Sequence, residues 1–231
     1  MNNTHIATVF DRDLEGIQTL LMKMGGLVES AILDAARALE DRDIELAEQV
    51  RRGDQVIDAL EEQINADCAR VIALRAPTAT DLRTVLTVMK IAGNLERCGD
   101  YAKNLAKRTL LLAGTPPVGS SAGSVRRLAK TVQGLLRDAL DAFIRRDAAL
   151  ADDVRNRDQD VDQMYNALFR EFVTYMMEDS RNISQMMHLH FIAKNIERVG
   201  DHATGIAEQV TYLVTGAMPN EDRPKADTTA A

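Results

Sequence analysis

Apolar residues recur every three to four positions along most of the chain, which is the period of an amphipathic α-helix. The clearest stripe runs from Leu14 to Leu39, and similar stripes continue to about residue 216. Proline, glycine and short polar stretches interrupt the pattern and mark turns. The pattern predicts six long helices, at about residues 10–39, 44–74, 80–113, 125–145, 148–178 and 182–216.

Two adjacent glycines, Gly25 and Gly26, lie in the middle of the first predicted helix. Each glycine costs a helix on the order of 1 kcal/mol relative to alanine. Such a pair indicates either a kink or the close approach of a neighbouring helix, and we favour close packing.

The two halves of the chain repeat each other. The nine residues from Asn94 (Asn-Leu-Glu-Arg-Cys-Gly-Asp-Tyr-Ala) recur from Asn195 (Asn-Ile-Glu-Arg-Val-Gly-Asp-His-Ala), with identity at six of nine positions. Residues 50–58 likewise align with residues 154–162. Glycine, proline and serine dominate residues 114–124, which therefore read as a linker. The repeat predicts an all-α protein of two tandem three-helix bundles, residues 1–113 and 125–216, followed by a disordered polar tail at 217–231.

Composition supports a helical, cytoplasmic protein. Aromatic residues make up 4% of the chain, and there are five prolines and no tryptophan. The net charge of −7 argues against a nucleic-acid or anionic-lipid partner. Cys68 and Cys98 form no CxxC motif, the N-terminus does not resemble a signal peptide, and no apolar run is long enough to span a membrane. Any membrane association is expected to go through a partner.

Each half carries two pairs of acidic residues spaced four apart, which puts both carboxylates of a pair on one helix face. If the second and third helices form an antiparallel hairpin about Pro77, the two pairs of the first half lie at the same height. A hairpin folded between Asp179 and Ser180 does the same in the second half. Four carboxylates are thus predicted to meet in each bundle: Asp54, Asp58, Glu96 and Asp100 in the first, and Asp158, Asp162, Glu197 and Asp201 in the second.

Clustered carboxylates repel one another and are costly to bury, so they call for protons, basic partners or cations. Oxygen-only ligands suit hard cations. We therefore predict that these eight acids bind metal, with Mg²⁺, Mn²⁺ or iron favoured over Ca²⁺ and Zn²⁺. The alternative is a set of exposed acids neutralised by nearby arginines, namely Arg51, Arg97, Arg155 and Arg198.

Several enzyme motifs are missing from the sequence. No Glu is followed by His three residues later, as the di-iron and ferritin bundles require, and there is no GxxxxGK[ST] or GxGxxG motif. We therefore predict a non-enzymatic protein. A metal-dependent enzyme or metal store, and an interaction module whose acids dock basic residues, remain as alternatives.

The repeated Asn-[Leu/Ile]-Glu-Arg-x-Gly-Asp motif, together with the segments at 10–14, 24–29 and 81–83, closely resembles the PhoU family. The resemblance covers residues 5–216 and implies two similar three-helix bundles in a cytoplasmic homodimer. It further implies a negative regulator of phosphate uptake and phosphate-starvation signalling. Such a regulator acts between the membrane phosphate ABC transporter and a sensor histidine kinase, with metal ions on the acidic pairs.

Overall fold

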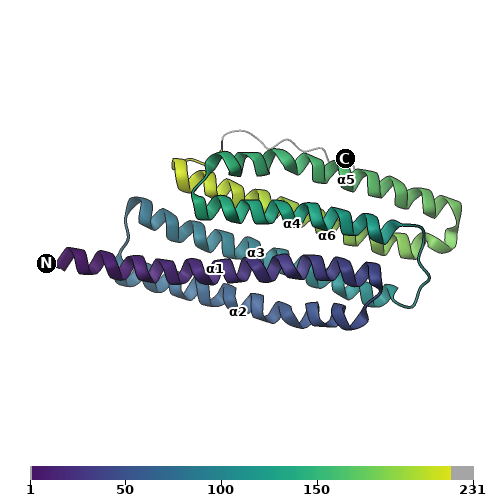
Figure 1. Ribbon diagram of the computed structural model, residues 1–231, viewed down its shortest axis with the longest axis horizontal. Coiled ribbons are helices and arrows are strands. Elements are labelled where there is room, and N and C mark those ends of the chain that lie inside the picture. The colour runs from purple at the N-terminus through teal and green to yellow at the C-terminus, as the bar shows by residue number, and fades with distance from the viewer. Residues whose placement is uncertain (1, 220–231) are drawn as a thin grey trace.

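The computed structural model describes residues 2–219, and the side chains from Phe10 onward. Six long helices make up this part of the chain, joined by short turns and without a strand (Figure 1). They are α1 (Asn2–Asp41), α2 (Ile44–Arg75), α3 (Ala79–Leu112), α4 (Ser121–Arg145), α5 (Ala148–Glu178) and α6 (Ile183–Thr215), with a short 3₁₀ turn, η1 (Ser180–Asn182), before α6. The predicted all-α class is confirmed.

The repeat extends to the turns between helices. Arg42 and Arg146 both adopt the left-handed conformation that ends a helix, with φ of 59° and 50°. The next residue caps the following helix in both halves: Asp43 Oδ1 accepts the Leu46 amide at 2.9 Å, and Asp147 Oδ1 accepts the Leu150 amide at 3.0 Å. The same Arg-Asp pair therefore builds the first turn of each bundle.

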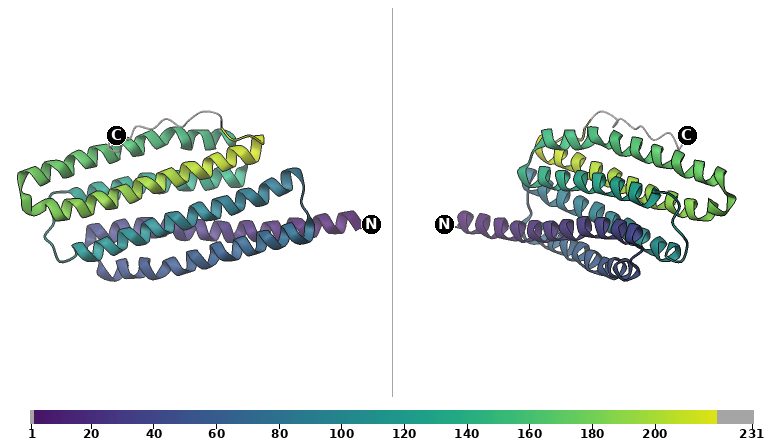
Figure 2. Two further views of the ribbon diagram at one scale, coloured as in Figure 1. Left: turned by 180° about the vertical axis from the view of Figure 1, so that it is seen from behind. Right: turned by 45° about the vertical axis from the view of Figure 1, so that its right-hand side comes forward.

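Helices α1, α2 and α3 pack on one another, as do α4, α5 and α6, so that each half forms its own bundle. The two bundles lie side by side, with α1 packed on α4 and α3 packed on α6 (Figures 1 and 2). All six helices contribute fully buried side chains, among them Leu21, Ile64, Leu95, Leu128, Phe172 and Met186. The predicted tandem arrangement is confirmed.

At Gly25, helix α1 closely approaches helix α4. A Cβ atom added there would lie 2.6 Å from Leu140 Cδ1, whereas one added at Gly26 would meet nothing within 4 Å. The close packing expected from the Gly-Gly pair is therefore a property of Gly25. Gly26 lies on the exposed side of the same helix.

Two helices begin earlier than the hydrophobic pattern predicted. Helix α1 starts at Asn2 rather than near Phe10, and its first turns project past the other helices (Figure 2). Because that stretch does not pack on the other helices, it needs no apolar face, and the hydrophobic pattern could not predict where the helix begins. Helix α4 starts at Ser121, so four residues assigned to the linker are helical: Ser121 is fully buried and donates a hydrogen bond to Glu171 Oε1 at 3.1 Å. Most of the predicted disordered tail, from residue 220, lies outside the described residues.

Candidate metal-binding carboxylate clusters

The first cluster consists of Asp54 and Asp58 on α2 and Glu96 and Asp100 on α3. Asp54 is 3% exposed, and the other three are partly exposed. Burial and the neighbouring charges of Asp54 and Asp100 raise the pKa of Asp58, and Lys103 opposes the effect. The predicted hairpin register therefore brings the carboxylates of both helices together.

The Glu96 carboxylate shows the same crowding from the other helix. Burial raises its pKa first, followed by the charge of Asp100 and, from α2, those of Asp58 and Glu61. Arg97, whose Nε lies 3.6 Å from Glu96 Oε2, lowers it. The pKa values of Asp58 and Glu96 are thus raised for the same two reasons, burial and neighbouring negative charges.

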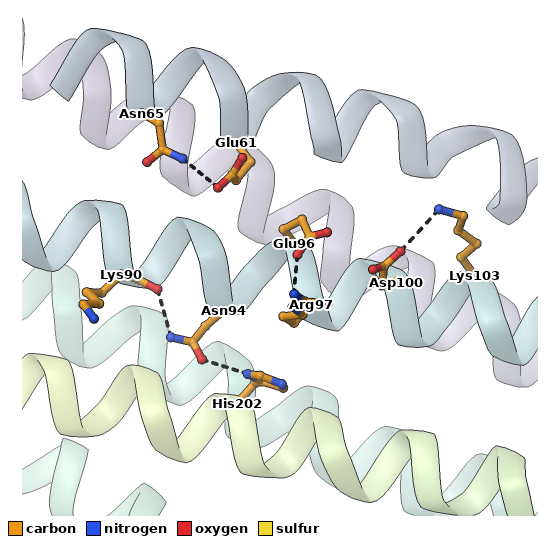
Figure 3. Close-up of polar contacts among 9 residues, drawn as sticks. All are labelled: Glu61, Asn65, Lys90, Asn94, Glu96, Arg97, Asp100, Lys103 and His202. Atoms are coloured by element: carbon orange, nitrogen blue, oxygen red, sulfur yellow. Dashed lines mark hydrogen bonds and ion pairs between the residues drawn. The ribbon is translucent and has the colours of Figure 1, made fainter. Parts of the chain in front are cut away.

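Lys103 is a member of this site that the sequence reasoning missed. Its ammonium forms an ion pair with Asp54 across the hairpin. It forms a second one with Asp100 Oδ1 on its own helix, at 3.3 Å (Figure 3). The hydrogen bond to Asp54 is the largest of the contributions that raise the pKa of Lys103. The spacing of three residues from Asp100 was the available signal.

The glycine of the repeated motif gives the α2 and α5 carboxylates their room. A Cβ on Gly99 would lie 3.2 Å from two Ile57 carbons and 3.4 Å from Asp54 Oδ1. A Cβ on Gly200 would lie 3.2 Å from Asp158 Oδ1. The same residue type thus admits the buried aspartate in both halves, which explains why the motif carries glycine between its two acids.

The second cluster consists of Asp158 and Asp162 on α5 and Glu197 and Asp201 on α6. Its first three members are 2%, 3% and 4% exposed, so it is more buried than the first cluster. Lys194 Nζ lies 3.0 Å from Glu197 Oε2 and 4.9 Å from the ring centroid of Tyr165. The contact of Asp158 with Gly200 fixes the same hairpin register as in the first half.

Two further motif residues, Asn94 of the first copy and His202 of the second, join the two bundles. Asn94 donates to the Lys90 carbonyl at 2.8 Å, and its Oδ1 lies 2.8 Å from His202 Nδ1 on α6 (Figure 3). Because the amide oxygen only accepts, Nδ1 of His202 carries the proton. Burial lowers the pKa of His202, with further contributions from Arg97 and Arg198. The motif therefore places its acids against the neighbouring helix of its own bundle, and it places Asn94 and His202 at the contact between the two bundles.

The donor chemistry of both clusters suits a hard cation, since every predicted ligand atom is a carboxylate oxygen. The geometry, however, is not that of a preformed site. Among the side chains of residues 10–219, no three Asp, Glu, His or Cys groups are placed so that they could hold one ion together. In the first cluster a lysine ammonium pairs with both helices instead. Metal binding by the eight acids thus stays a prediction.

Comparison with known proteins decides the family. The model of the PhoU domain matches residues 21–109 and again residues 125–210, one match in each bundle. The chain belongs to the PhoU family. The two matches coincide with the two halves of the internal repeat, and each spans one carboxylate cluster.

Curated relatives of this PhoU-family chain align over nearly their whole length. A phosphate-specific transport system accessory protein PhoU homolog of Rhizobium meliloti is 43% identical over 230 residues, covering 100% of this chain and 97% of the relative. One of Caulobacter vibrioides is 44% identical over 223 residues, covering 96% and 97%. The names of these relatives describe accessory proteins, which agrees with the prediction of a non-enzymatic role.

Solved PhoU structures share the fold. The crystal structure of PhoU from Pseudomonas aeruginosa has a TM-score of 0.86 at 43% identity and covers 90% of this chain and 100% of the solved one. The phosphate transport system regulatory protein PhoU from Streptococcus pneumoniae has a TM-score of 0.84 at 30% identity, with coverages of 92% and 100%. In the described part of this chain, no helix has the length and apolarity needed to cross a membrane.

Proposed function

We propose that this PhoU-family chain is a non-catalytic cytoplasmic regulator of phosphate homeostasis that acts on the phosphate-specific ABC transporter at the membrane. The observation that carries the proposal is the full-length relationship to accessory proteins of phosphate-specific transport, at 43–44% identity. The two-bundle architecture, with one PhoU domain in each bundle, supports it. The chain works as a homodimer that holds the transporter in its inactive state when phosphate is plentiful.

The regulation is negative and reaches a phosphate-sensing histidine kinase as well as the transporter. The chain acts on both partners by binding rather than by chemistry. When phosphate is plentiful, the chain keeps the kinase from signalling starvation. When phosphate is scarce, both partners are released.

The carboxylate clusters are proposed to bind Mg²⁺, Mn²⁺ or iron, through Asp54, Asp58, Glu96 and Asp100 in the first bundle and Asp158, Asp162, Glu197 and Asp201 in the second. Each set of four neighbouring negative charges would be relieved by a divalent cation. Because every cluster joins two helices of one hairpin, a bound cation would brace that hairpin. The raised pKa of Asp58 and of Glu96 supports the proposal, since burial and then the neighbouring carboxylates disfavour the ionised form, and a cation would favour it.

The regulatory proposal is tested by deleting the gene and following a phosphate-starvation reporter in phosphate-rich medium. We expect the reporter to switch on in the deletion strain and to switch off again when the wild-type gene is restored. Membrane fractionation with and without the transporter tests the partner. A reporter that stays off in the deletion strain contradicts negative regulation.

The metal proposal is tested on protein purified without chelator, by elemental analysis together with the solution mass. The variant Asp58→Asn/Glu96→Gln removes two charges from the first cluster, and Glu15→Gln/Glu178→Gln removes two exposed charges elsewhere as a matched control. We expect the first variant to lose metal and the control to keep it. Equal metal contents in all three proteins rule out the first cluster, and a monomeric mass rules out the homodimer.

A further inference from the structure

Lys103 occupies the place in the first cluster where a bound cation would be most effective. Its ammonium reaches Asp54 on α2 and Asp100 on α3, so a single positive charge joins the two helices that contribute carboxylates. We propose that Lys103 is the resident counter-cation of the first cluster, and that a metal ion binds there only by displacing its ammonium. The inference rests on the metal binding proposed above, and its test separates the two.

The need for a resident cation follows from the burial of Asp54. This carboxylate is 3% exposed, and within the described structure it pairs with the Lys103 ammonium through Oδ2. An ionised carboxylate in such a place requires a positive partner. Arg97 is 63% exposed and lies beside Glu96, and Arg51 is paired with Glu48 at 2.7 Å. Lys103 therefore supplies the charge that Asp54 needs.

The internal repeat shows that this lysine is particular to the first half. The motif offset of 101 residues puts Thr204 at the position equivalent to Lys103. The Thr204 hydroxyl is fully buried and donates to the Gly200 carbonyl of its own helix at 3.1 Å. The lysine near the second cluster, Lys194, comes from a position equivalent to Gly93. The lysines near the two clusters thus occupy non-equivalent positions of the repeat. The substitution Lys103→Thr gives the first half the residue that the second half has at the equivalent position.

The ammonium of Lys103 is also able to move away from the carboxylates. Its side chain is 28% exposed, and its flexible four-carbon stem lets the ammonium turn from the carboxylates into water without a change in the helix. A divalent cation that takes its place brings two positive charges to four carboxylates. Metal binding would then release an amine at the surface of α3, one helical turn before the exposed Lys107. Lys103 is therefore a site-specific reporter of the first cluster.

The affinity experiment titrates Mn²⁺ by electron paramagnetic resonance in a background whose second cluster is silenced by Asp158→Asn and Asp201→Asn. Loss of a charge-assisted hydrogen bond that competes with the metal corresponds to an affinity gain of about tenfold. We expect Lys103→Thr to lower the Mn²⁺ dissociation constant by about tenfold, and the matched control Lys107→Thr to leave it within about twofold. Far-ultraviolet circular dichroism confirms that each variant is folded.

A second measurement uses the wild-type chain and needs no variant. An amine-reactive ester labels lysines before and after addition of Mn²⁺, and mass spectrometry compares Lys103 with Lys107. We expect Mn²⁺ to raise the labelling rate of Lys103 severalfold and to leave that of Lys107 unchanged. If the titration shows that the natural first cluster binds Mn²⁺, unchanged labelling of Lys103 overturns the inference.

The affinity outcomes distinguish the inference from the metal proposal. If the silenced background binds Mn²⁺ and Lys103→Thr binds it no more tightly, the inference fails alone. If only the Lys103→Thr variant binds Mn²⁺, the inference stands, and metal binding by the natural first cluster is refuted. If neither protein binds Mn²⁺, both proposals fail for this cluster.

Discussion

Replacing Glu96 by glutamine removes one charge from the first cluster while keeping the size of the side chain. Glu96 is 28% exposed and faces the like charges of Asp100, Asp58 and Glu61. Its one opposing partner in this set, Arg97, is largely exposed and adjacent in sequence. We therefore expect Glu96→Gln to stabilise the metal-free protein rather than to weaken it.

The magnitude follows from the surroundings of the carboxylate. Interactions between partly exposed charges amount to about 0.2–1 kcal/mol each, and like charges destabilise by similar amounts. Repulsion by three neighbours, offset in part by Arg97, gives a net gain of about 0.5–1 kcal/mol. For a chain of this length that gain corresponds to a rise in melting temperature of about 1–4 °C.

The stability difference between Glu96→Gln and the wild type should depend on pH. The pKa of Glu96 is raised on folding, so the ionised carboxylate lowers stability at neutral pH. This penalty is relieved as pH falls through the folded-state pKa, and it is absent below the ordinary value of 4.5. The advantage of Glu96→Gln should be largest near pH 7 and should shrink steadily toward acid pH.

The assay is urea unfolding in excess chelator at a series of pH values, with Glu15→Gln as the control because that carboxylate is exposed on α1. Added Mn²⁺ should reverse the order at neutral pH by stabilising the wild type more than the variant. A metal-free Glu96→Gln protein that is less stable than the wild type at pH 7 would refute the account of the cluster as a centre of repulsion.

Further predictions concern packing and thiol reactivity. Gly25→Val should lower the free energy of unfolding by about 1–3 kcal/mol because its side chain collides with Leu140, whereas Gly26→Val on the open side should change it by less than about 0.5 kcal/mol in urea melts. Burial raises the pKa of Cys68 to about 11 and raises that of Cys98 further, so both thiols should resist iodoacetamide at pH 8 until the protein is unfolded. Rapid alkylation of folded protein would show that α2 and α3 separate readily.

The helical register was predictable because it depends on local periodicity. The turn about Pro77 lies between the end of α2 at Arg75 and the start of α3 at Ala79, as expected. From that turn the pairing of Asp58 with Glu96 and of their neighbours followed by counting, since antiparallel helices keep a fixed relation along their length. Local periodicity and the position of one turn therefore suffice to place the acids of α2 opposite those of α3.

The ends of the helices were harder to predict from the sequence because they depend on contacts with other helices. Ser121 belongs to α4 through its burial against α5 and its hydrogen bond to Glu171. The metal-ligand interpretation of the acids met a similar limit, because the sequence indicates that carboxylates gather but does not give the positions of long side chains that reach them.

The sequence by itself determined six helices and their pairing into two equivalent bundles, and it predicted acids on the facing helices of each hairpin, because all three follow from local period and repeat. Only the tertiary structure showed that the bundles pack through Gly25 and through the contact of Asn94 with His202, and that Lys103 lies among the acids of the first cluster. These features depend on which helix faces meet and on the rotamers of flexible side chains. Neither is encoded in the spacing of residues along one helix.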